Sequence, residues 1–222
     1  MDTENVVCTE TTEVTNTDYS VWCEQICKIF TDYITCTSVR VDNKKLKGQC
    51  CVGDTWVLSN GPMFMQTNRY IKGIVDTTDT TDIEIYKSIL TQLETCSYRT
   101  IPRKDVSNAR KVYKENKLKY FEQVGMKRAT MTAELKQAMQ QTGMFNYTFI
   151  GTPNGYTFST IYLQDMLQVA GLESVHLFIG ILEDTNLNVR VPVLRIRGEF
   201  CTLWLFGRKV DDNITEGDGE FM

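Results

Sequence analysis

His176 is the only histidine in the chain, and a catalytic role for it would point to a hydrolase that uses a histidine base. It lies in "SVHLFIGIL", where apolar residues occupy both sets of alternating positions, as in a strand covered on both faces. The chain has no G-x-S-x-G nucleophile elbow to accompany such a base. We therefore expect His176 to be a buried strand residue and not a catalyst.

The eight cysteines are the next candidates, because thiolates bind zinc. Cys23 and Cys27 are one helical turn apart, but the usual C-x-x-C knuckles do not occur. Cys50 and Cys51 are adjacent and would point to opposite faces of a strand. Reduced structural thiols explain these positions better than a metal site does.

Carboxylates could also hold a cation or act as an acid and base pair. The run "DTTDTTD" places Asp76, Asp79 and Asp82 three residues apart, whereas calcium loops space their ligands every two residues. Helix capping explains this run better. Glu183 and Asp184 fall in an expected hairpin loop, and no Gly-rich phosphate loop occurs. The sequence therefore predicts no catalytic residue, no metal, no cofactor and no small-molecule substrate.

A stripe of basic residues is the most unusual feature. Arg103, Arg110, Lys114 and Lys117 follow one another at intervals of seven, four and three, which places them on one face of a helix. The positive charge is extended by further basic residues, of which we expect three to bind a partner: Lys111, Lys127 and Arg128. Such a stripe could bind nucleic-acid phosphates, receive an acidic segment of protein, or be an ordinary solvated face.

The two ends of the chain are acidic. Residues 1–20 contain five acidic and no basic residues, and residues 211–222 again contain five and none. Residues 99–136 contain eleven Lys and Arg against four acidic residues. We therefore expect the acidic tails to dock on the basic helix, within one chain or between neighbouring chains.

Hydrophobic periodicity predicts the elements that must position these residues. Helices are expected over about 18–34, 83–96, 105–124, 132–141 and 159–171, and β-structure over 38–58, 63–75 and 174–207. Pro192 cannot donate a ladder bond, so its strand is expected to be bulged or at a sheet edge.

The order of these elements predicts an α+β fold, an antiparallel sheet with helices packed on it. We expect an acidic arm over 1–17, one domain over 18–210 and an acidic tail over 211–222. Within the domain, 36–76 should be rich in β-structure, 99–142 should be basic and helical, and 156–207 should form a helix and a β-hairpin. The chain has no signal peptide and no membrane span, so we expect a protein that is not secreted.

The segment from "GTPNGYTFSTIYLQDMLQVAG" through "VHLFIGILEDTNLNVRVPVLRIRG", within residues 151–198, resembles a pattern in uncharacterised proteins of Bacteroidetes bacteria and their phages. In this pattern a capped helix ends at Gly and leads to two apolar strands joined by an acidic-Asn turn. The second strand departs from it at Pro192, Arg195 and Arg197. The resemblance implies a bacterial or phage origin and brings no activity or site with it.

These observations together favour a non-enzymatic assembly subunit. The particle would be a phage virion, with the chain as a connector, ring or tail subunit in the virion or the host cytoplasm. Its partners would be copies of itself and other subunits. The alternative is a protein that binds nucleic acid through 103–128, and an enzyme with a carboxylate-based or metal-based site is the least favoured hypothesis.

Overall fold

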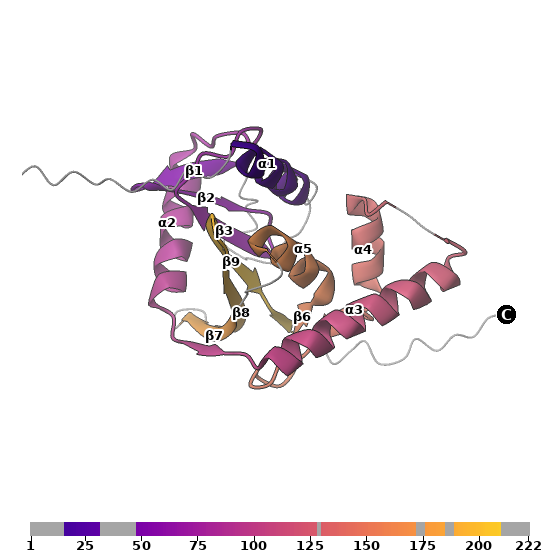
Figure 1. The fold of residues 1–222 in the computed structure, drawn as a ribbon. Coiled ribbons are helices and arrows are strands. Elements are labelled where there is room, and N and C mark those ends of the chain that lie inside the picture. The colour runs from indigo at the N-terminus through magenta and orange to yellow at the C-terminus, as the bar shows by residue number, and fades with distance from the viewer. Residues whose placement is uncertain (1–15, 32–47, 128–129, 172–175, 185–188, 210–222) are drawn as a thin grey trace, which may run out of the picture.

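The computed structural model describes residues 16–31, 48–127, 130–171, 176–184 and 189–209 (Figure 1). The helices in this part are α1 (Asn16–Thr31), α2 (Thr80–Thr95), α3 (Arg103–Gln123), α4 (Ala133–Gln141) and α5 (Thr160–Ala170). The acidic arm expected over 1–17 lies outside it except for Asn16 and Thr17, which belong to α1. The acidic tail, and residues 38–47 of the β-structure expected over 38–58, also lie outside the described residues.

Seven strands form one antiparallel sheet, in the order β1-β2-β3-β9-β8-β7-β4. Their bounds are β1 (Gln49–Val52), β2 (Thr55–Ser59), β3 (Met63–Thr67), β4 (Tyr98–Thr100), β7 (Leu177–Asp184), β8 (Val189–Arg197) and β9 (Cys201–Phe206). A smaller sheet has the order β10-β6-β5, with β5 (Asn146–Tyr147), β6 (Tyr156–Ser159) and β10 (Arg208–Lys209). The predicted α+β class, an antiparallel sheet with helices packed on it, is confirmed.

The helices lie on both faces of the large sheet (Figure 1). The α2 helix covers one face, while α5 and α1 cover the other, and α3 packs on the outside of α5. The strand β9 contributes to both layers because its side chains alternate. Leu203 and Leu205 are buried in the core beside α5, and Trp204 and Phe206 are buried in the core beside α2.

The start of α2 explains the acidic run noted in the sequence. The carboxylate of Asp79 accepts hydrogen bonds from the backbone N–H groups of Thr81 at 2.8 Å and Asp82 at 3.3 Å. These bonds satisfy N–H groups that have no partner inside the helix. Helix capping is therefore the role of Asp79, as the sequence predicted.

Three expectations about the positions of residues are wrong. Glu183 and Asp184, expected in a hairpin loop, are the last residues of β7 and pair with Arg190 and Val189 of β8. His176 precedes β7 and is exposed, because the regular pairing of β7 with β8 begins only at Leu177. Pro192 lies in β8, which is an internal strand between β7 and β9. Its carbonyl accepts from Gly207 N at 2.7 Å, and the ladder with β9 begins one residue later, at Val193. Pro192, which has no N–H, therefore lies just beyond the end of the ladder between β8 and β9. The strand accommodates this proline without a bulge and without being at the edge of the sheet.

Candidate interaction surface

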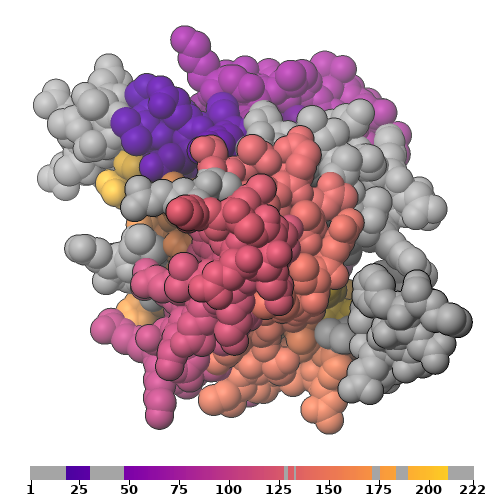
Figure 2. Space-filling view, turned by 90° about the vertical axis from the view of Figure 1, so that its right-hand side faces the viewer, coloured from indigo at the N-terminus to yellow at the C-terminus, as the bar shows by residue number. Residues whose placement is uncertain are grey.

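The basic helix α3 is fixed to the rest of the molecule along one side. Near its start, the buried carboxylate of Asp105 accepts from Tyr147 Oη at 2.5 Å and from Ile150 N at 3.0 Å. Further along, Asn116 Nδ2 donates to the Met144 carbonyl. Ala109 and Phe121 are buried in the core below. These contacts leave the other side of α3 at the surface, where it faces the viewer in Figure 2.

The structure places the predicted stripe on one flank of α3. The intervals between Arg103, Arg110, Lys114 and Lys117 keep these residues within about a sixth of the helix circumference. Arg103 and Lys114 are exposed, while Arg110 and Lys117 are half-buried. Lys117 Nζ lies 5.9 Å from the ring centre of Tyr113 and 5.5 Å from that of Phe121. The stripe therefore forms the border between the buried and the solvated sides of the helix.

The remaining predicted partner-binding residues are not part of this stripe. Lys111 points to the solvated side and forms an ion pair with Glu115, with 3.7 Å between Nζ and Oε1. Lys127 is exposed and follows the end of α3. Arg128 lies outside the described residues. The stripe and Lys111 thus belong to one helix surface, and Lys127 lies beyond its end.

The C-terminal end of α3 also exposes apolar side chains. Leu118, Val124 and Met126 have exposed fractions of 65%, 45% and 44%. This feature was not predictable from the sequence, because Leu118 and Val124 fit the apolar pattern of an ordinary helix. The exposed surface of α3 therefore combines a positive flank with an apolar end, and we name it the α3 surface.

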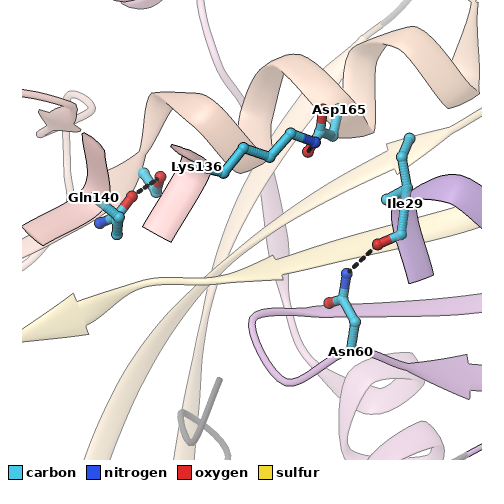
Figure 3. A network of polar contacts seen from close by, with 6 residues as sticks. Ile29, Asn60, Lys136, Gln140 and Asp165 are labelled. Carbon is cyan, nitrogen blue, oxygen red and sulfur yellow. Dashed lines mark hydrogen bonds and ion pairs between the residues drawn. The ribbon is translucent and has the colours of Figure 1, made fainter. Parts of the chain in front are cut away.

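The helix α4, which follows α3, is held by polar contacts inside the molecule (Figure 3). Lys136 Nζ on α4 lies 2.7 Å from Asp165 Oδ2 on α5, and both side chains are buried. On the same helix, the Gln140 side chain accepts a hydrogen bond from Ser159 Oγ. Burial, followed by the charge of Asp165, raises the pKa of Tyr113 on α3. These contacts fix α4 and α5 relative to each other below the α3 surface.

Two further arginines, Arg195 and Arg197, stand out in the sequence only because they depart from the pattern that residues 151–198 resemble. They lie on β8 on the α2 side of the large sheet, where they follow the buried Val193 on the same face of the strand. Arg195 is half-buried and Arg197 is exposed. The sequence signal that could have found them is their spacing of two within a predicted strand, which places both on one face.

No group of three His, Cys, Asp or Glu side chains in the described part of the chain could hold a metal ion. Among the same residues, no helix is long and apolar enough to cross a lipid bilayer. The α3 surface is positively charged, so it can attract acidic groups through an interaction that salt would screen.

Comparisons with models of protein families, with curated proteins and with solved structures find no match to this chain.

Proposed function

We propose that the chain is a non-enzymatic subunit of a multi-chain assembly, and that the α3 surface binds an acidic segment of a neighbouring subunit. One observation carries the proposal. The helix α3 contains seven basic and three acidic residues, and Lys111–Glu115 is the one ion pair that its cations form within the described residues. A helix held rigidly at the surface with unneutralised positive charge is suited to an acidic partner.

The acidic ends of the chain supply such a partner. Each end contains five acidic residues and no basic ones, over residues 1–20 and 211–222. Exposed ion pairs contribute about 0.2–1 kcal/mol each, so one pair would not hold an assembly together. Several pairs along the six turns of α3 would act together, and they would weaken as salt rises.

The apolar end of the α3 surface favours protein over nucleic acid as the partner of this helix. Leu118, Val124 and Met126 would be covered in a protein interface, whose centre is richer in apolar and Met side chains than its rim. A phosphate backbone offers no apolar surface to cover them. The alternative function, nucleic-acid binding through 103–128, leaves these side chains unexplained.

The assembly that we propose is the one expected from the sequence, a phage virion, in which the chain would be a connector, ring or tail subunit. The support for this part is the resemblance of residues 151–198 together with the complementary charges of the ends and of α3. The neighbours would then be copies of this chain and other virion subunits.

Light scattering of the full-length, untagged protein at low and high salt tests the proposal. We expect a species larger than the 25.5 kDa monomer at low salt, which dissociates as salt rises. The variant Lys111→Glu/Lys114→Glu should remain monomeric. Lys28→Glu/Lys72→Glu is the matched control, because it changes the same amount of charge at exposed positions outside α3 and should assemble normally.

Removing residues 1–15 or 211–222 should weaken the assembly and leave the circular dichroism spectrum of the domain unchanged. A protein that stays monomeric at every salt concentration would contradict self-assembly. Assembly that survives both truncations would show that the acidic ends are not the partner of α3.

A further inference from the structure

Part of the large sheet is left open on the face that α2 covers. Along β8, the residues on this face are Val193, Arg195 and Arg197, and they change from buried through half-buried to exposed. The neighbouring strands follow the same trend: Phe178 and Thr202 are half-buried and Thr100 is exposed. The register joins these residues, since Thr100 pairs with Phe178, Phe178 with Arg195, and Arg197 with Thr202. We name this region the sheet corner.

Arg195 is held in place by aromatic side chains. Its guanidinium carbon lies 3.8 Å from the ring centre of Tyr98 and 5.1 Å from that of Phe178. The Tyr98 ring is itself fixed, because its hydroxyl donates to the Leu93 carbonyl at 2.8 Å and accepts from Trp204 Nε1 at 3.0 Å. A guanidinium stacked in this way keeps its N–H groups in a fixed plane, which suits binding of an oxyanion.

Within the described residues neither arginine forms an ion pair, and Arg195 Nε is buried without a hydrogen-bond partner. Burial, and after it the nearby charge of Arg197, lowers the pKa of Arg195. Glu94, at the end of α2, accepts from Gln66 Nε2 at 3.1 Å instead. An anion that bound here would relieve the repulsion between the two cations.

The donors available favour phosphate over carboxylate. Each guanidinium carries five N–H donors, and the hydroxyls of Thr100 and Thr202 stand on the neighbouring strands of the same face. Arg195 and Arg197 are two residues apart, which separates their Cα atoms by about 6.6 Å along the strand. The exposure of this face rises along β8 toward Arg197. Two cations side by side on one face of a strand suit successive phosphates of a polyanion better than one small anion.

We propose that the sheet corner binds the sugar–phosphate backbone of single-stranded nucleic acid, with Arg195 and Arg197 each contacting a phosphate. Cations that contact the backbone, combined with aromatic side chains, are the means by which proteins bind a single strand without reading its sequence. This site is distinct from the α3 surface, which lies on the other side of the large sheet beyond α5.

Fluorescence anisotropy of labelled oligo(dT), titrated with the full-length protein at several salt concentrations, tests the site. Each lost phosphate contact on a single strand lowers the slope of log K against log salt by about 0.7. We therefore expect Arg197→Gln to lower the slope by about 0.7, and Arg195→Gln/Arg197→Gln to lower it by about 1.4 with at least about a tenfold loss of affinity. Arg195→Lys should keep the slope and weaken binding, since it retains the charge without the planar fork.

Arg190→Gln is the matched control, because Arg190 is on the same strand and is already paired with Glu183 at 2.7 Å. It should bind oligo(dT) like the unaltered protein. Lys111→Glu/Lys114→Glu should also retain binding, which separates this site from the α3 surface.

Three results would overturn the proposal. The first is that the protein does not bind oligo(dT). The second is that the α3 variant loses oligo(dT) binding while the sheet-corner variants keep it. The third is that the protein binds poly-glutamate as tightly as oligo(dT) and that this binding depends on Arg197. The second would assign nucleic acid to α3, and the third would make the sheet corner a site for acidic protein.

Discussion

At the scale of single residues, Cys50 and Cys51 show how the alternation of a strand separates two neighbours. The Cys50 side chain is buried in the core beside α2, whereas Cys51 is exposed. Burial raises the pKa of the Cys50 thiol to about 11, so it has little thiolate at neutral pH.

Brief alkylation of the native protein with iodoacetamide should therefore modify Cys51 and spare Cys50. Peptide mapping by mass spectrometry distinguishes the two, and the same reaction in denaturant, where both should react, is the control. Equal labelling of both in the native protein would show that the pairing of β1 with β2 is wrong.

The hydrogen bond between Tyr147 and Asp105 should make the stability of the protein depend on pH in the alkaline range. Burial and then this bond raise the pKa of Tyr147 to about 12. Below the usual tyrosine pKa of about 10, the phenol is protonated in both the folded and the unfolded state, and its contribution is complete. Above that pH the unfolded state loses the proton first, so the contribution falls as pH rises toward about 12.

Urea unfolding of Tyr147→Phe and of the unaltered protein across this range tests the effect. The unaltered protein should be more stable at pH 8, and the difference in unfolding free energy should shrink between about pH 10 and pH 12. A difference that stays constant would mean that the phenol does not titrate with folding.

At the scale of elements, the ion pair between Lys136 on α4 and Asp165 on α5 joins two helices inside the molecule. Breaking a buried pair leaves an uncompensated charge and costs about 3–5 kcal/mol, whereas replacing both partners by apolar side chains costs much less. We expect Asp165→Leu alone and Lys136→Met alone each to destabilise strongly. The double variant should be more stable than either, as measured in a double-mutant cycle of urea unfolding. Additive losses would contradict this coupling.

The pairing of β4 with β7 depends on Gly180. A Cβ at this position would lie 2.6 Å from Cys96 Sγ and 2.9 Å from Tyr98 Cδ1, both too close for a normal contact. Gly180→Ala should therefore destabilise the fold by about 1–3 kcal/mol, as overpacked cores do. Adding Cys96→Ala removes the nearest atom and should recover part of the loss in thermal unfolding. No recovery would mean that the cost arises elsewhere.

The elements themselves were predictable to different degrees. The helix expected over 105–124 occupies Arg103–Gln123, because its apolar residues recur at helical spacing over many turns. The strands β5, β6 and β10 have only two to four residues, too few to show any periodicity. The order of the strands was not predictable either. It depends on the pairing of β3 with β9, which are far apart in the sequence, and no local pattern encodes it.

At the scale of the whole molecule, the two cores share one sheet. A shared sheet is what we expect if residues 18–210 form a single domain. Leu203 and Trp204 are adjacent on β9 and are buried in opposite cores. Leu203→Ala and Trp204→Ala should each cost about 2–5 kcal/mol. Both should shift the same single unfolding transition, seen alike by fluorescence and by circular dichroism. Two separate transitions would divide the chain into two domains.

The candidate sites were predictable in part. The spacing of Arg103, Arg110, Lys114 and Lys117 was enough to place them together on α3, since they belong to one helix. The sheet corner could be found only from the structure, because Arg195 and Tyr98 are brought together by the pairing of β8 with β7 and of β7 with β4. The apolar end of α3 could also be found only from the structure, since the exposure of its side chains depends on what packs around the helix.

The central position of β9 has a consequence for the synthesis of the protein. Residues 201–206 pair with β3 on one side and β8 on the other, so the sheet is divided into two parts until they leave the ribosome. Before then, β3 and β8 both present unpaired edges that other nascent chains could join. Messages that are cut short before codon 201 should therefore yield products that aggregate, and the last strands to be translated are the ones that complete the fold.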